Sequence, residues 1–172
     1  MPAPRLRISP PGPRRAAEAC GDGASSTLTC QIRPLDEGAP PTLRDRIDAA
    51  LHVAAPVRQA VIGGLDLVLD EDDRPVSMEL YTNPLRWTRA EGASPTPEAA
   101  DVALELDYDA NGIASVDVPL TVEHDPSRGS LTLRFGLEVR RWYAPATGLL
   151  LGADSEDRLA AIRCEKVARG PR

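Results

Sequence analysis

The chain has 172 residues and a formal net charge of −6, with 27 % charged and 42 % hydrophobic residues. These near-average fractions exclude a chain that is disordered throughout. The acidic balance argues against nucleic acid as the default partner, because phosphate binding needs clustered cations. Aromatic residues make up only 3 %, so the core must be built from aliphatic side chains.

Cysteine usage and the apolar pattern bear on the compartment. The three cysteines, at positions 20, 30 and 164, include no C-x-x-C pair, which favours reduced thiols over a disulfide framework or a zinc site. The first residues lack the apolar run of a signal peptide, and no run approaches the roughly 18 apolar residues of a membrane span. We therefore expect a soluble cytoplasmic protein with no membrane association.

The first third of the chain begins with a segment of unusual composition. Residues 1–24 are rich in proline, glycine, arginine and alanine, which predicts a flexible basic arm in which residues 6–8 could add a short edge strand. Apolar residues alternate over 28–32, which predicts a strand. Residues 42–53 predict a helix, because Thr42 can cap it and apolar residues recur at helical spacing.

After the predicted helix the apolar period returns to two. Leu65, Leu67 and Leu69 alternate with polar residues, and the acidic turn 70–73 leads to a second alternating run over 76–80. This pattern predicts a β-hairpin. The following residues, 88–100, contain Gly92, Pro95 and Pro97 with polar neighbours, which predicts a linker.

The last third of the chain predicts two more hairpins. The alternating run 102–108 ends in an Asn-Gly turn, a strong hairpin signal because both central residues of a type I′ turn need positive φ. We expect residues 116–122 to form the return strand. A second turn, over 125–129, then precedes the alternating run 131–139.

An internal repeat is the main organising feature of the sequence. Residues 64–81 align without a gap on residues 148–165, and the predicted inward positions agree in phase. Residues 28–32 also resemble 131–135, provided that the helix is an insertion in the first copy. Chance similarity between two hairpins is the alternative explanation.

The repeat leads to a fold prediction. We expect a mainly β (α+β) fold of two pseudo-repeated antiparallel β units with one or two short helices. The first β-rich repeat spans 25–87 with the helix at 42–53, the linker spans 88–100, and the second repeat spans 101–168. A unit of half this size buries little surface alone, so the two copies should pack together as a fused dimer.

The repeat also carries a resemblance to a known family. Residues 124–135, followed by 148–158, resemble the small bacterial family called domain of unknown function 2283, in which a Tyr-Asp-Pro turn precedes a strand and an acidic Gly-Arg hairpin. Residues 70–79 are the closer match to the second half of that pattern. His124 replaces the usual Tyr, and Asp73 and Ser77 replace glycines. The resemblance implies a compact β-rich fold and no established activity, although some relatives are suspected of neutralising toxins.

Two acidic turns are candidate cation sites. Asp107, Asp109 and Asn111 alternate as in the first half of a calcium loop, but Val118 stands at its twelfth position and cannot be a ligand. The acids at 70–73 could hold a divalent ion, yet consecutive acids in a turn are usually only solvated. We expect hairpin turns, with no metal and no cofactor.

The sequence contains no catalytic constellation. The two histidines, His52 and His124, have no partner at a metal-binding spacing, and there is no Gly-x-Ser-x-Gly elbow or glycine-rich phosphate loop. A lone histidine in such a context is more often a core or surface residue. We therefore do not expect an enzyme, although a deep pocket with an acid beside a histidine would reopen the question.

Two clusters of arginine and aromatic residues are the candidate binding sites. Arginine and tryptophan together suit binding surfaces, because they combine contact area, cation–π attraction and hydrogen bonding. The alternative is that each tryptophan seals a sheet edge beneath an arginine stem. The residues of the two clusters are Arg86, Trp87 and Arg89 in the first copy, and Arg140, Arg141, Trp142 and Tyr143 in the second.

These clusters give two functional hypotheses. The first is a non-catalytic interaction module, antitoxin-like or regulatory, that binds a protein partner or a second copy through the Trp87 and Trp142 surfaces. The second is a nucleic-acid-binding protein that uses the basic arm and the same tryptophans, for which salt-dependent binding of single strands would be the sign.

Overall fold

The computed structural model describes residues 2–22, 25–35 and 58–169, and β-strands are the main secondary structure of these residues. The mainly β fold is therefore confirmed. The only helical element in the described ranges is the short 3₁₀ helix η1 (Pro84–Arg86). The helix predicted over 42–53 lies outside the described residues. No described segment forms a helix with the length and apolarity that a membrane crossing requires.

The strands form two large sheets and a small ribbon. In chain order they are β1 (Arg5–Ser9), β2 (Arg15–Asp22), β3 (Thr27–Pro34), β4 (Arg58–Ile62), β5 (Leu65–Leu69), β6 (Pro75–Tyr81), β7 (Thr88–Arg89), β8 (Glu98–Ala99), β9 (Asp101–Glu105), β10 (Ile113–Val116), β11 (Thr121–Asp125), β12 (Ser130–Arg134), β13 (Arg141–Ala146), β14 (Leu149–Ala153), β15 (Leu159–Cys164) and β16 (Ala168–Arg169).

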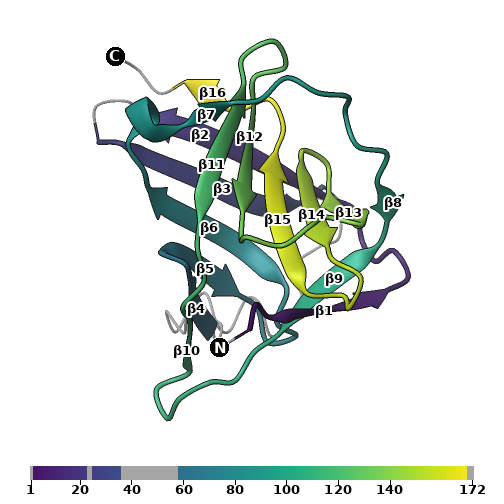
Figure 1. Ribbon diagram of the computed structural model, residues 1–172. Helices are drawn as coiled ribbons and strands as arrows, with labels where there is room; N and C mark the ends of the chain where they lie inside the picture. Colours follow the sequence, from purple (N-terminus) through teal and green to yellow (C-terminus); the bar gives the residue numbers. More distant parts are fainter. Residues whose placement is uncertain (1, 23–24, 36–57, 170–172) are drawn as a thin grey trace, which may run out of the picture.

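The two sheets lie face to face (Figure 1). Sheet I has the order β10-β4-β5-β6-β3-β2-β16, and sheet II has the order β7-β11-β12-β15-β14-β13-β8. The ribbon is the antiparallel pair β1-β9. Alternate side chains of both sheets point into a shared aliphatic core. Met78 and Ile162, the repeat positions expected to face inward, are 4 % and 2 % exposed.

The duplication is confirmed by topology and register. Each sheet contains five antiparallel strands in the same order, β2-β3-β6-β5-β4 in sheet I and β11-β12-β15-β14-β13 in sheet II. Leu65 pairs with Leu80 as Leu149 pairs with Cys164, and both hairpins carry a bulge at the same place near the turn. A shared bulge is a strong sign of common construction, because bulges are specific local features rather than defects.

The acidic turns of the two copies also share one geometry. The Asp70 carboxylate accepts hydrogen bonds from the amides of Asp72 and Arg74, both at 2.9 Å. The Asp154 carboxylate accepts from the equivalent amides at 2.9 and 2.8 Å. The fourth residue of each turn, Asp73 or Asp157, has a left-handed backbone with φ of 66° or 59°. These aspartates act as caps of their own turns.

The two repeats exchange their flanking strands. β7, which follows the first repeat, pairs with β11 of sheet II, and β16, which follows the second repeat, pairs with β2 of sheet I. The ribbon makes the same exchange: the amide of Leu6 donates to Asp157 O at 2.7 Å, and the amide of Leu104 donates to Asp73 O at 2.9 Å. Each repeat is therefore completed by strands that belong to the other.

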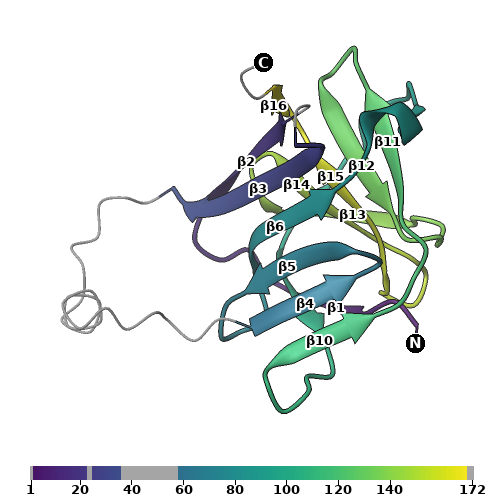
Figure 2. The same ribbon diagram turned by 90° about the vertical axis from the view of Figure 1, so that its left-hand side faces the viewer.

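The sheets are also joined along their sides. β10 pairs with β4 of sheet I, and the chain then continues into β11 of sheet II (Figure 2). On the opposite side, the amide of Thr147 donates to Arg15 O at 2.9 Å, and the amide of Ala17 donates to Thr147 O at 2.8 Å. These backbone bonds fix the separation of the two sheets.

Three local predictions differ from the structure. The segment 1–24 was predicted as a flexible arm, yet 5–9 and 15–22 form β1 and β2, because β9 of the other repeat pairs with β1 and β3 of the same repeat pairs with β2. The linker 88–100 holds β7 and β8, because these strands pair with β11 and β13. The Asn-Gly turn forms, with φ of 75° at Gly112, but β9 and β10 leave it for different partners, so no hairpin results.

Substitution of the equivalent glycines Gly64 and Gly148 tests the contact between β2 of sheet I and the turn after β13 of sheet II. Both have positive φ, +90° and +87°, so an alanine at either position is strained by about 1 kcal/mol or more. A Cβ at Gly148 would also lie 2.9 Å from Ala17 O, whereas nothing lies within 4 Å of a Cβ at Gly64. We expect Gly148→Ala to lower the free energy of unfolding by about 1–3 kcal/mol more than Gly64→Ala. Urea unfolding measures both, and equal losses would contradict the close approach of β2 to this turn.

Candidate functional site

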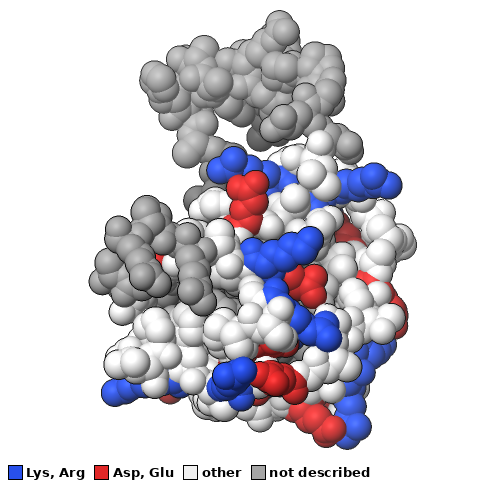
Figure 3. All heavy atoms as spheres, turned by 90° about the horizontal axis from the view of Figure 1, so that it is seen from above, with Lys and Arg blue, Asp and Glu red and all other residues white. Residues whose placement is uncertain are grey.

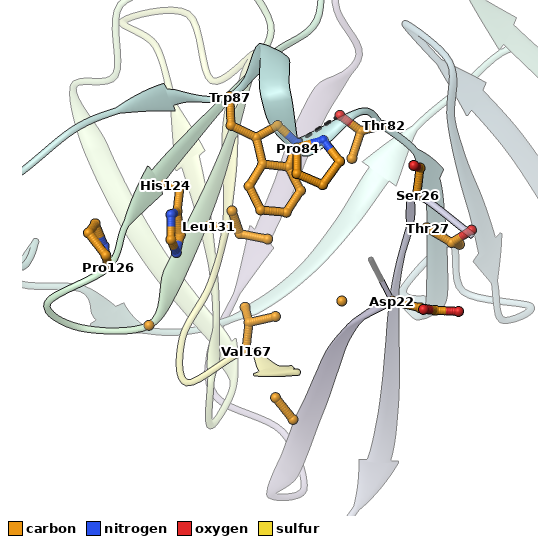
Figure 4. A pocket seen from close by; sticks show the side chains of 13 residues that line it. Asp22, Ser26, Thr27, Thr82, Pro84, Trp87, His124, Pro126, Leu131 and Val167 are labelled. Carbon is orange, nitrogen blue, oxygen red and sulfur yellow. Dashed lines mark hydrogen bonds between the residues drawn. The ribbon is translucent and has the colours of Figure 1, made fainter. Parts of the chain in front are cut away.

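A cavity of about 420 Å³ opens between the two sheets (Figure 4). It lies at the end of the molecule where β7 and β16 are found (Figure 1). Apolar side chains provide much of its wall, from Pro84, Trp87, Leu131 and Val167. Polar side chains stand at other points of the lining: Asp22, Ser26, Thr27, Thr82 and His124. Cavities of this size, mostly apolar with a few polar groups, are the usual form of a ligand site.

Trp87 is held in the cavity wall by several contacts. Its indole Nε1 donates a hydrogen bond to Thr82 Oγ1 at 3.0 Å. Its ring meets the imidazole of His124 edge-on, with centroids 5.7 Å apart and an angle of 60° between the planes. The preceding turn is fixed by Asn83, whose side chain accepts from the amide of Leu85 at 3.0 Å. The indole is therefore positioned before any ligand arrives.

The cavity lies between equivalent turns of the two repeats. The amide of Thr82 donates to Ser26 O in the first repeat, and the amide of Val167 donates to Gly129 O in the second, both at 2.7 Å. Ser26 and Gly129 both have left-handed backbones, with φ of 55° and 64°. The chain that leaves each repeat, after β6 or after β15, is its departing segment. Each departing segment thus forms a backbone hydrogen bond with the first turn of its own repeat before it crosses to the other sheet.

The two departing segments then differ. The first passes through η1 and Trp87 before β7 reaches His124, whereas the second runs directly from Val167 into β16 beside Gly21. His124 of β11 lies opposite Arg89 of β7, and Gly21 of β2 lies opposite Arg169 of β16. His124 and Gly21 therefore occupy equivalent places in the two repeats. The repeats therefore place an indole and an imidazole on one side of the cavity and much smaller residues on the other.

The predicted clusters are only partly brought to this site. Trp87 lines the cavity, and Arg86 lies exposed beside it in η1. Arg89 is exposed and paired with Glu91, and Arg140 is exposed and paired with Glu138. Trp142 is half-buried and packs over Gly152 of β14. If residue 152 carried a Cβ atom, that atom would lie 3.2 Å from Trp142 Cζ3.

Tyr143 cannot serve as a surface binding residue, because its side chain is only 2 % exposed. In β13 it alternates with Trp142, so the strand points it into the core, where burial raises the pKa of its hydroxyl.

Arg141 has a structural explanation. Its guanidinium pairs with Asp157 of the second acidic turn at 2.5 Å and lies 5.9 Å from the Tyr143 ring. At the equivalent place in the first repeat, Arg58 pairs with Asp73 at 2.6 Å and lies 5.1 Å from the Tyr108 ring. Both arginines therefore hold a left-handed aspartate at the turn, a role that the duplication explains without a partner.

The acidic turns use their carboxylates internally. The Asp109 carboxylate accepts hydrogen bonds from the amides of Ile113 and Asn111, which lowers its pKa. Asp125 is bonded to the hydroxyl and amide of Ser127, and its pKa is lowered as well. Within the described part of the chain, no group of three His, Cys, Asp or Glu side chains is placed to hold a metal ion.

The thiols give no accessible nucleophile at the cavity. Cys30 and Cys164 are fully buried in the core, where their mutual hydrogen bond and burial raise the pKa of Cys164. Cys20 is partly buried, and none of the three forms a disulfide. Thiols that are sealed in a core pack as small apolar side chains.

Sequence reasoning found Trp87 as a binding candidate and considered His124 as a pocket residue, but it missed the other residues of the cavity. Thr82, Leu131 and Val167 lie at strand ends in unremarkable contexts. The available signal was positional: the repeat alignment places the first turns of both copies, and the ends of both hairpins, at one end of the molecule.

The hydrogen bond from Trp87 to Thr82 predicts the effect of removing its acceptor. In a Trp142→Phe background, where Trp87 is the only tryptophan, we expect Thr82→Val to lower the free energy of unfolding by about 1 kcal/mol. We also expect tryptophan emission to change, because the indole loses its fixed partner. Urea unfolding followed by fluorescence measures both. Thr88→Val is the matched control, since Thr88 is exposed; a loss as large in the control would contradict the assigned role of Thr82.

Comparison with the known protein families and with curated proteins finds no match to this chain. The resemblance to the domain of unknown function 2283 family stays a prediction, and the functional argument depends on the geometry of the site.

Proposed function

We propose that this chain is a non-catalytic binding module whose ligand site is the cavity at Trp87. The size of the cavity, its apolar wall and its few polar groups support a site that encloses one small molecule or one apolar group of a larger partner. Pre-positioning of the indole supports binding further, since less freedom is lost when the ligand arrives.

The observation that carries the proposal is the local difference between the two repeats. Register, bulge and turn geometry are the same in both hairpins. At the cavity, one copy places η1, Trp87 and His124 where the other has Val167 and Gly21. A difference that places an indole and an imidazole at a preformed cavity supports recognition of a ligand, because the symmetric hairpins already achieve the packing of the core.

Binding is favoured over catalysis by the partners of the polar groups. The carboxylate of Asp125, the residue after His124, is bonded to Ser127. The carboxylate of Asp22 is bonded to Ser25. Each carboxylate thus already takes part in its own turn, so orienting the imidazole of His124 for general base catalysis would compete with those hydrogen bonds.

The two partner classes predicted from the sequence stay predictions with unequal support. A protein partner would insert an apolar side chain beside Trp87. A nucleic acid is supported less, because three of the four arginines in the predicted clusters already pair with carboxylates: Arg89, Arg140 and Arg141. We further propose a cytoplasmic location, supported by the free cysteines in the described chain.

Occupation of the cavity can be tested with an uncharged fluorescent probe. We expect N-phenyl-1-naphthylamine to bind the intact protein. We expect the Gly21→Leu variant to bind this probe at least about tenfold more weakly. Gly21 lines the cavity, and a Cβ there would meet only Val167 Cγ1 at 3.8 Å, an ordinary contact, so the leucine should enter the cavity without strain.

Gly92→Leu is the matched control, since nothing lies within 4 Å of a Cβ at that position. It should bind the probe as the parent protein does. Probe titration with a thermal melt of each variant is the measurement. Undiminished binding by a folded Gly21→Leu protein would show that the probe binds elsewhere, and would contradict the proposal.

A further inference from the structure

We infer that the cavity takes an amphipathic anion, with the apolar part of the ligand against Trp87 and its anionic group at the mouth beside Lys166 and Arg86. This inference depends on the proposed function, because it names the class of ligand for the same cavity.

The apolar part of the ligand follows from the cavity wall. Leu131 of β12 is 2 % exposed and packed into the core, so it forms a fixed apolar surface. Trp87 and Val167 face the same space from the two departing segments (Figure 4). Burial of apolar ligand surface against this wall is favourable, which favours a chain or ring over a fully polar ligand.

The anionic group follows from two cations that adjoin cavity-lining residues in the sequence, although neither side chain itself lines the cavity. Arg86 directly precedes Trp87, and Lys166 directly precedes Val167, so each lies next to a residue that lines the cavity. Both side chains are exposed, and neither makes an ion pair or a side-chain hydrogen bond with the described residues. Lys166 sits at a left-handed position, with φ of 54°, one residue beyond Glu165, which follows the end of β15.

Neighbouring arginines near the cavity are already neutralised. Arg89 pairs with Glu91 at 2.5 Å, and Arg128 lies 3.5 Å from Asp125. Figure 3, which looks onto this end of the molecule, shows basic and acidic side chains close together over much of the face. Arg86 and Lys166 are the exceptions in the described chain at this end, and they offer hydrogen-bond donors to a carboxylate, sulfonate or phosphate.

The one acid on the cavity wall does not reverse this preference. Asp22 accepts a hydrogen bond from Ser25 Oγ at 2.7 Å, so its carboxylate takes part in the first turn of the repeat. Asp125, the equivalent residue in the second repeat, also caps its own turn. A cationic ligand would therefore compete with hydrogen bonds that the turn requires.

Three eight-carbon ligands that differ in their head group test the inference at pH 7. Octanoate, 1-octanol and octylammonium are titrated into the full-length protein loaded with N-phenyl-1-naphthylamine, and loss of probe fluorescence gives each affinity. Two exposed cations predict that octanoate binds about five- to tenfold more tightly than 1-octanol. Raising the ionic strength to about 0.5 M should shrink that ratio, because salt screens exposed charges.

The variants separate this inference from the proposed function. In Lys166→Gln with Arg86→Gln, the preference for octanoate should fall to about twofold or less while probe binding is kept. Arg89→Gln, which removes a cation that is already paired, should leave the preference unchanged.

Each other outcome overturns the inference. Three outcomes would reject the anionic ligand and leave the proposed function intact. The first is equal affinity for octanoate and 1-octanol, and the second is tighter binding of octylammonium than of octanoate. The third is that none of the three ligands displaces the probe, although the probe binds the parent protein and does not bind the Gly21→Leu variant. A preference for octanoate that survives in the double variant would place the anion elsewhere. Failure of the probe to bind the parent protein would instead reject the proposed function itself.

Discussion

The structure depends on how the edges of its two sheets are completed. An open sheet edge exposes unpaired backbone groups, which favours association with another chain. Here each repeat sends its last segment to the other sheet, as β7 beside β11 and β16 beside β2. The β1-β9 ribbon adds a second exchange, in which Leu6 and Leu104 donate to the turns of opposite repeats. The two copies are therefore one folding unit rather than two adjacent domains.

The same exchange creates the candidate site. Both departing segments must cross from one sheet to the other, and they do so at one end of the core, so the space between them is enclosed by both repeats. The first crossing is longer and carries Trp87, whereas the second is direct. A duplicated scaffold thus gives a symmetric core and an asymmetric cavity. This arrangement explains why Arg141 and Trp142 have structural roles while Trp87 lines the cavity.

The sequence predicted those features that depend on local pattern. Alternation fixed the inward faces of 64–81 and 148–165, because a one-residue slip would expose every apolar side chain. It could not predict the partners of β1, β9 or β10, since a turn such as Asn111-Gly112 specifies a reversal but not the sheet that receives each strand. For the same reason Trp87 was found as a binding candidate, whereas Thr82, Leu131 and Val167 became its neighbours only through long-range pairing.

The mutual completion of the repeats is tested most directly by separating them. Cutting the exposed segment between Ser94 and Pro95 gives two chains, 1–94 and 95–172. Each chain can be studied alone and in a mixture by circular dichroism and sedimentation. The account predicts that neither chain alone is a cooperatively folded monomer, and that mixing restores one 1:1 complex with the parent melting transition. A stable, monomeric, cooperatively melting half would show that the exchanged strands are dispensable, and would contradict the account.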